Sequence, residues 1–200
     1  MPDRIMSVDA GFAACGVAIF ELVAEGNMAG GAAEWTPRYL ECVRTEADKR
    51  DGTYVAQDDM KRMVEMANRL DQLRKFHDCK WLVAEIPGGG GQSARAVRAM
   101  SMCSGMLAGF LAATGIGYEC FMPWDTRKAA GVPGSVRTGK DVKQIVMANM
   151  RKTYPYFAKW ECTVTKVDSE NVADALACFV CAKNIGQMIG HITPLARRSP

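Results

Sequence analysis

The sequence lacks the segments that direct a chain into or through a membrane. Pro2, Asp3 and Arg4 open it, no cationic segment leads into an apolar signal core, and no run approaches the roughly 20 apolar residues of a membrane span. It also lacks linkers, repeats and low-complexity tracts beyond four glycines at 88–91. With 200 residues, 48% of them hydrophobic, the chain predicts one domain, 1–200, in a soluble, intracellular protein without a membrane partner.

The cysteines do not form the dense, loop-rich framework of a disulfide-stabilised protein. All eight are scattered through apolar runs, which indicates buried thiols in a reducing compartment. Cys178 and Cys181 form a C-x-x-C pair, but neither a second pair nor a nearby histidine accompanies them. The pair therefore predicts core packing in a helix rather than a zinc site.

Excess charge of either sign is also missing from the chain as a whole, because its net charge is only +3. A balance this small says nothing about partners. The segment 126–166 differs, since it holds nine basic residues against the two acids Asp141 and Glu161. That segment is a candidate surface for a polyanion. Its basic residues are Arg127, Lys128, Arg137, Lys140, Lys143, Arg151, Lys152, Lys159 and Lys166.

The hydrophobic pattern predicts an α/β fold with one mixed sheet covered by helices. Short apolar runs separated by glycine-containing breaks indicate three consecutive antiparallel strands near the amino terminus. Two further strands alternate with helices, and a glycine-containing loop leads to the closing helices. We expect strands at 5–9, 16–23, 39–46, 81–86 and 117–122, and helices at 55–77, 93–114, 141–152 and 169–187.

Three acids stand where the predicted elements would present them to one point. Asp9 ends the first strand, Glu85 ends the fourth, and Asp174 lies in the last helix between apolar neighbours. An unpaired carboxylate in such a position is costly, and crowded carboxylates repel one another unless divalent cations are present. Hard Mg²⁺ or Mn²⁺ prefers oxygen ligands, and two such ions roughly 3.5–4 Å apart would support phosphodiester hydrolysis. The acids therefore predict nuclease chemistry.

Four segments, taken in order, resemble RuvC-type Holliday junction resolvases, which have a ribonuclease H-like fold. They are Ser7-Val8-Asp9-Ala10-Gly11, Gly16-Val17-Ala18, Val83-Ala84-Glu85 and Ala173-Asp174-Ala175-Leu176-Ala177. The resemblance implies a five-stranded mixed sheet, three antiparallel strands then two parallel, flanked by helices. It also implies a crossover junction endodeoxyribonuclease, a structure-selective enzyme that cuts four-way or other branched DNA with Mg²⁺, for which Mn²⁺ substitutes.

The resemblance implies Asp9, Glu85 and Asp174 as catalytic metal ligands. A fourth ligand is expected one helical turn before the last aspartate, where the chain offers Glu170 and Asn171. We favour Glu170, because an anionic oxygen binds Mg²⁺ better than a neutral amide does. Asn171 remains the alternative.

The resemblance also suggests which residues contact DNA. The turn after Glu85 is expected to enter the junction centre, and it contains Pro87 and four glycines but no aromatic wedge. Lys140 opens a helix after a glycine-rich loop, as does a phosphate-contacting lysine of the family, and Lys143 follows one turn later. The predicted DNA contacts are Gly89, Gly90, Gln92, Ser93, Arg95, Arg137, Lys140 and Lys143.

A homodimer is the expected assembly, because a symmetric four-way junction requires paired incisions. The helix predicted at 93–114 is the candidate interface, since its apolar side chains cover more than one side. Those side chains are Met100, Met102, Cys103, Met106 and Phe110.

Two other classes compete with the nuclease. The run 134–140 fits the first seven positions of a P-loop, which favours a nucleotide triphosphatase, although Asp141 replaces the expected Ser or Thr. A binding module that lost a ligand at Asn171 would keep the fold and bind branched DNA without cutting it. An actin-like ATPase needs two comparable domains, for which 200 residues leave no room.

Overall fold

A computed structural model describes most of the chain, namely residues 3–24, 34–48, 50, 54–86, 93–136, 139–187 and 189. Four of the predicted DNA contacts, Gly89, Gly90, Gln92 and Arg137, lie outside these residues. The other four, and all of the predicted metal ligands, lie within them.

The described strands form one five-stranded sheet in the order β3-β2-β1-β4-β5. The first three strands along the chain pair antiparallel, and β4 and β5 then add parallel strands beside β1. This confirms the mixed α/β sheet with a ribonuclease H-like strand order. The strands are β1 (Arg4–Ala10), β2 (Ala14–Ala24), β3 (Glu34–Arg44), β4 (Trp81–Glu85) and β5 (Gly117–Phe121).

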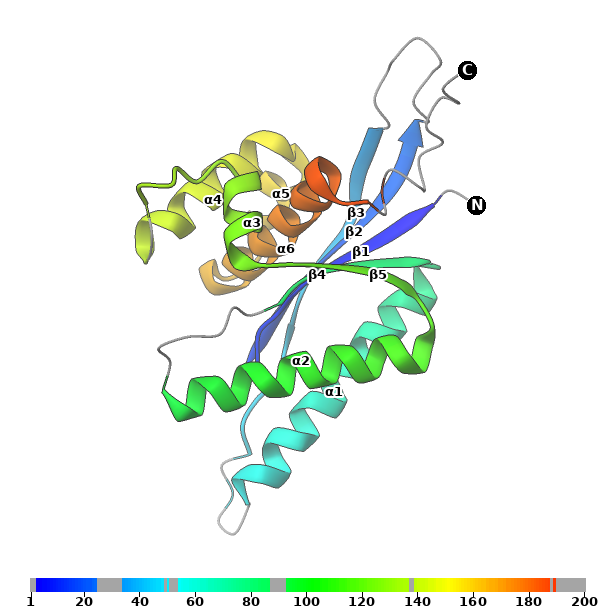
Figure 1. Cartoon of the computed structure of the whole chain (residues 1–200), viewed down its shortest axis with the longest axis vertical. Helices are drawn as coiled ribbons and strands as arrows, with labels where there is room; N and C mark the ends of the chain where they lie inside the picture. The colour runs from blue at the N-terminus through cyan, green and yellow to red at the C-terminus, as the bar shows by residue number, and fades with distance from the viewer. Residues whose placement is uncertain are drawn as a thin grey trace.

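The helices cover the two faces of this sheet separately (Figure 1). On one face lie α1 (Val55–Phe76) and α2 (Ala94–Thr114), which pack on a core that includes Met6, Val17 and Leu82. The other face carries a core centred on Phe20 and Phe179. Its helices are α3 (Pro123–Ala129), α4 (Lys140–Thr153), α5 (Pro155–Trp160), the 3₁₀ turn η1 (Glu161–Thr163) and α6 (Lys166–Ile185).

Two elements begin at least three residues earlier than the sequence pattern predicts. Strand β3 starts at Glu34 rather than at residue 39, because it is an edge strand, where Pro37 can be accommodated without a ladder donor. Helix α6 starts at Lys166 rather than at residue 169. The Thr165 hydroxyl caps it by accepting a hydrogen bond from the Asp168 amide at 3.3 Å.

Three short helical elements, α3, α5 and η1, were not predicted. Two of them start with a proline in the first turn, Pro123 in α3 and Pro155 in α5, where the missing amide hydrogen is no loss. Each has seven residues or fewer, too few to show a helical hydrophobic period. The loop expected after β5 therefore begins as a helix, and this helix carries residues of the candidate site.

Helix α2 corrects the expectation that no run resembles a membrane span. It has 21 residues, and an 18-residue window within it reaches a mean hydropathy of 1.4, so it is long and apolar enough by length and composition. Only 22% of that window is buried. Arg95 and Arg98 near its start interrupt the apolar run and hide this property in the sequence. Helix α2 thus leaves much apolar surface outside the core.

Candidate active site

Asp9 and Glu85 lie opposite each other at the same end of the sheet. Strands β1 and β4 are parallel, and their register pairs Asp9 with Glu85 directly. The antiparallel partner of Asp9 on the other side is Gly16 of β2. The apolar strand residues before each acid pack in the two cores, so each acid lies where a buried strand ends.

Asp174 reaches the same place from α6, which lies unusually close to β1 and β2. A Cβ on Gly16 would stand 1.9 Å from the backbone oxygen of Asn171, so only glycine permits this approach. The buried Ser7 hydroxyl also donates a hydrogen bond of 2.6 Å to the backbone oxygen of Ala175. These two contacts hold α6 on the sheet on either side of Asp174 along the chain.

The charges of the three carboxyl groups act on one another. The pKa of Asp9 is raised well above its usual range by burial, then by Asp174 and Glu85, while Lys143 opposes the rise. Burial, followed by the charge of Glu85, raises the pKa of Asp174 to about 7. The pKa of Glu85 is also raised by burial, against the Thr126 hydrogen bond and the charge of Arg127. Burial, more than any other cause, therefore makes the charged carboxylates of the cluster costly.

Such a cluster matches the chemistry of a divalent metal site. All three groups offer carboxylate oxygens, the ligands that Mg²⁺ and Mn²⁺ prefer, and a cation would compensate for the mutual repulsion. Among the described residues, however, no three His, Cys, Asp or Glu side chains stand close enough together to form a ready metal site. The donor set fits the metal in kind, and the metal role of Asp9, Glu85 and Asp174 stays a prediction.

Glu170, the favoured fourth ligand, is engaged by lysines. Lys143 Nζ of α4 donates to Glu170 Oε2 at 2.8 Å, and Lys166 Nζ lies 3.9 Å from Oε1. Its charge adds to the rise in the pKa of Asp174, after burial and the charge of Glu85. The alternative, Asn171, donates instead to the Val167 backbone oxygen at 2.8 Å and contacts Cys42 of β3 at 3.9 Å. Of the two, Glu170 is the one that bonds Lys143, a residue that lines the α4 side of the acid cluster.

Two cavities meet at Glu85. The larger, of about 370 Å³, lies beside α4 and is lined by Glu85 and Asp174 together with the cationic residues Arg127, Lys140 and Lys143. The smaller, of about 130 Å³, is lined by Asp9, the turn after it, Glu85 and three residues of α2. The larger cavity is hereafter the α4 cavity. It combines acids that suit a metal with bases that suit phosphate oxygens.

Comparison with solved structures supports the ribonuclease H-like fold described above. No model of a known protein family and no curated protein matches the chain by sequence. The chain is similar to Thermus thermophilus RuvC in complex with Holliday junction substrate, with a TM-score of 0.60 and 13% identity over 89% of this chain and 91% of that chain. A second Thermus thermophilus RuvC structure gives 0.61 and 14%, over 89% and 92%. The yeast mitochondrial Holliday junction resolvase Ydc2 gives 0.58 and 11%, over 98% and 83%.

The fold is that of the RuvC-type resolvases. At these identities the likeness concerns the fold, so any function has to be argued from the residues of this chain.

Within this RuvC-type fold, the four described DNA-contact candidates are placed differently. Lys140 is exposed, opens α4 and lines the α4 cavity, and Lys143 stands one turn further on. Arg95 is exposed near the start of α2. Ser93 caps α2, its hydroxyl accepting a hydrogen bond from the Ala96 amide at 3.3 Å. The structure thus brings both lysines to the acids and gives Ser93 a structural role as well.

Two residues of the site were not selected from the sequence as site residues. Thr126 of α3 is buried and its hydroxyl donates a hydrogen bond to Glu85 Oε2. Arg127, the next residue, lines the α4 cavity. The sequence signal for these two residues is that the basic segment begins at Thr126. Because α3 was not predicted, neither residue could be placed beside the acids.

The P-loop alternative receives no support from the described residues. A P-loop needs a buried strand that leads into its glycine-rich turn. The described residues between β5 and α4 form α3 and turns but no strand, and β5 ends at Phe121, well before Gly134. The glycine that precedes α4, Gly139, has a positive φ of 85° and simply starts the helix.

Proposed function

We propose that this protein is a divalent-metal-dependent endonuclease that cuts branched DNA, four-way junctions above all. The observation that carries the proposal is the convergence of Asp9, Glu85 and Asp174, with the raised pKa values of all three carboxyl groups, beside a cavity lined by cations. The fold shared with structures described as Holliday junction resolvases supports the choice of substrate.

The three acids, with Glu170 as the fourth group, would hold Mg²⁺ or Mn²⁺, which supplies an activated water and stabilises the leaving oxygen. The chain itself binds and orients the phosphodiester. Lys140 and Arg127 line the α4 cavity and suit phosphate oxygens. Lys143 donates to Glu170 and also lines the α4 cavity with Asp174. The hydrogen bond to Glu170 and the charges of Asp174 and Asp9 raise the pKa of Lys143 and keep it cationic.

Removing ligand charge tests the proposal. We expect Asp9→Asn and Glu85→Gln to abolish cleavage of a four-way junction in Mg²⁺ and in Mn²⁺ while leaving junction binding in EDTA unchanged, because the basic surface stays intact. Cleavage would be followed on denaturing gels and binding by fluorescence anisotropy. Cleavage by either variant at the wild-type rate would contradict the assignment.

The selection of branched DNA is tested by comparing a four-way junction, a flap and a linear duplex at equal concentration. The basic residues supply backbone affinity without base information, so binding to all three should fall steeply as salt rises. Discrimination then has to come from the geometry of the protein on the branch. We expect the junction to be cut fastest. Equal rates on all three would indicate a general nuclease.

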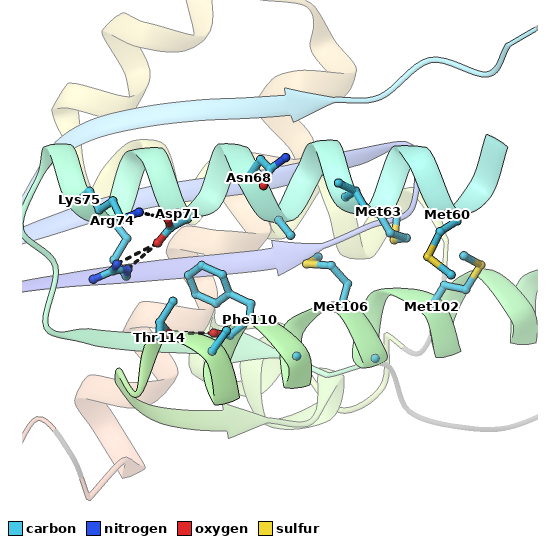
Figure 2. A pocket seen from close by; sticks show the side chains of 15 residues that line it. Met60, Met63, Asn68, Asp71, Arg74, Lys75, Met102, Met106, Phe110 and Thr114 are labelled. Carbon is cyan, nitrogen blue, oxygen red and sulfur yellow. Dashed lines mark hydrogen bonds and ion pairs between the residues drawn. The ribbon is translucent and has the colours of Figure 1, made fainter. Parts of the chain in front are cut away.

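A homodimer through α2 is part of the same proposal. Figure 2 shows the groove between α1 and α2, where Met60 and Met63 face Met102 and Met106. The groove measures about 750 Å³, and Met60 is 60% exposed. The charged residues of α2 are Arg95 and Arg98 at its start, so two copies of the remaining helix can approach without like-charge repulsion. A second copy of this chain is therefore the occupant we propose.

A charge placed in the groove tests the dimer. Met106→Glu should convert the dimer to a monomer in light scattering at micromolar concentration, because a carboxylate would be buried without a partner. Val167→Glu is the matched control, since Val167 is 54% exposed on α6, across the sheet. A wild-type monomer, with or without junction DNA, would remove the idea.

A non-catalytic branched-DNA-binding module is the second candidate. Two observations favour it: the described acids form no ready metal group, and Glu170 is held by Lys143. Tight junction binding by the wild-type protein without cleavage in Mg²⁺ or Mn²⁺ would establish this alternative.

A further inference from the structure

Helix α3 brings a buried hydroxyl group to Glu85. Thr126 is 2% exposed, and its Oγ1 donates a hydrogen bond to Glu85 Oε2, 41 residues earlier in the chain. The same Oγ1 lies 3.1 Å from the backbone oxygen of Pro123. A hydroxyl has one hydrogen to give, and the bond to the carboxylate is the charge-assisted one. Thr126 therefore differs from a helical threonine that only bonds its own preceding turn.

The position of this hydroxyl is fixed by the elements around it. The Ala130 amide closes α3 on the Thr126 backbone oxygen at 2.9 Å. The Ala130 backbone oxygen in turn accepts a hydrogen bond of 2.7 Å from the Asn149 side chain of α4. On the strand side, the Ile86 amide donates to the Phe121 backbone oxygen at 2.9 Å, which extends the β4–β5 pairing past Glu85. The backbone near both Thr126 and Glu85 is therefore held by hydrogen bonds.

The bond engages one of the two carboxylate oxygens of Glu85. A carboxylate with one oxygen held can no longer rotate freely about its last bond, so its other oxygen keeps a defined direction. Glu85 lines both cavities that meet at the acid cluster, where such a direction matters. Because Thr126 is β-branched and buried, its own side chain has few conformations to lose.

We propose that Thr126 is a positioning residue that orients the Glu85 carboxylate for the divalent cation. The inference rests on the proposed metal-dependent function, and groups that orient a ligand in this way typically contribute roughly 10–100-fold to metal affinity. Thr126 itself contacts neither the metal nor the DNA in this proposal.

The test compares Thr126→Val, which keeps the shape and loses the hydroxyl, with Thr126→Ser, which keeps the hydroxyl. Mn²⁺ binding to the full chain without DNA is measured by electron paramagnetic resonance of the free ion. We expect Thr126→Val to weaken Mn²⁺ binding by roughly 10–100-fold and Thr126→Ser to stay within a few fold of wild type. Thr163→Val is the matched control, because Thr163 donates to the Trp160 backbone oxygen at 2.7 Å and bonds no acid.

A double-mutant comparison separates orientation from a purely structural role. In a Glu85→Gln background, loss of the Thr126 hydroxyl should reduce Mn²⁺ affinity no further, since the group it orients is already gone. Wild-type Mn²⁺ affinity in Thr126→Val, or equal losses in the Val and Ser variants, would overturn the proposal. So would a full further loss in the Glu85→Gln background. If Thr126→Val does not fold, Thr126→Ala and the Ser variant carry the same comparison.

The failure of this proposal can be told from failure of the proposed function. Junction cleavage by the wild-type chain together with unchanged Mn²⁺ affinity in Thr126→Val would remove the role of Thr126 alone. Mn²⁺ binding that depends on the hydroxyl, in a chain that cuts no DNA, would keep the role of Thr126 and remove the nuclease.

Discussion

Helices α6 and α2 lie on opposite faces of one sheet and are buried to very different degrees (Figure 1). Ten residues of α6 are buried, against three of α2. A helix that is apolar on most sides belongs in a core, and α6 is placed there under α3, α4 and α5. Helix α2 is also rich in apolar residues, but among the described elements it packs on α1 and the sheet. Burial is thus decided by neighbours, not by composition.

The difference extends to function, because each helix contributes to the acid cluster in its own way. Helix α6 brings Asp174 on a rigid support. From α2, Met100 and Cys103 line the small cavity at Asp9, while Met102 and Met106 line the groove on α1. A partner seated in that groove would therefore lie against the same helix that borders the site.

The largest expected effect is on the α6 side of the core. Phe179 is fully buried and stacks on Phe20, with ring centroids 3.5 Å apart. Phe179→Ala should lower the free energy of unfolding by about 3–5 kcal/mol, because it leaves a cavity between packed rings. Met106→Ala on α2 should cost about 1 kcal/mol or less in the monomer, since that side chain is only partly buried. Similar losses in urea unfolding of both variants would break the comparison.

The next effect concerns Asp174, the residue that α6 contributes to the acid cluster. Burial, then Glu85 and Glu170, raises the pKa of Asp174 from 3.8 to about 7 against Lys143 and Arg127. The folded chain therefore binds the proton more tightly than the unfolded chain, and the metal-free protein loses stability as pH rises from about 4 to 7. The shift corresponds to roughly 2–4 kcal/mol after allowance for partial exposure.

Asp174→Asn removes that dependence. The metal-free variant should be more stable than wild type at pH 8 and no more stable at pH 4, as measured by urea unfolding in EDTA at both values. Added Mg²⁺ should stabilise the wild-type chain more than the variant. An equal stability difference between variant and wild type at the two pH values would show that the Asp174 charge does not destabilise the metal-free protein.

A smaller loss is expected where α6 meets β2. Gly16→Ala places a methyl group 1.9 Å from the Asn171 backbone oxygen, so the helix has to move. Overpacking of this kind typically costs about 1–3 kcal/mol, and the displacement should also weaken Mn²⁺ binding because Asp174 moves with α6. Thermal unfolding and Mn²⁺ titration of the variant measure the two effects. Wild-type values in both would mean that α6 tolerates a greater distance from the sheet.

The smallest effect has the opposite sign and belongs to α2. Apart from its chain neighbours and its own helix backbone, no atom of the described residues lies within 4 Å of the Cβ position at Gly109, which is inside the helix. Gly109→Ala should therefore raise the stability of the monomer by up to about 1 kcal/mol, because alanine favours the helical backbone. Thermal unfolding below the dimerisation concentration is the measurement. A loss of stability would show that a methyl group at this position is not accommodated freely within the monomer.

Much of this molecule follows from short-range patterns in its sequence. Alternating apolar runs and glycine breaks indicate five strands in the correct order, and an acid at the end of β1 and of β4 is visible without any structure. Helices α3 and α5 escape such a reading because one or two turns show no period. For the same reason Thr126 could not be connected with Glu85.

Pairings across the chain required the tertiary structure. A residue three or four positions before Asp174 shares its helical face within a few tens of degrees, so the pattern admits both Glu170 and Asn171. Packing separates them, because Asn171 is turned toward Cys42 of β3 and Glu170 toward Lys143 of α4. The chain order contains no information on which helix stands next to which.

The sequence by itself determined the order of the five strands and the four longer helices, and the positions of the three acids at two strand ends and in the last helix, because these depend on residue type and local period. The tertiary structure alone decided that Thr126 holds Glu85, that Lys143 holds Glu170, and that the described residues leave most of α2 uncovered. Each of these depends on atoms brought together from distant parts of the chain, and the close approach of α6 over Gly16 depends on a side chain that is absent.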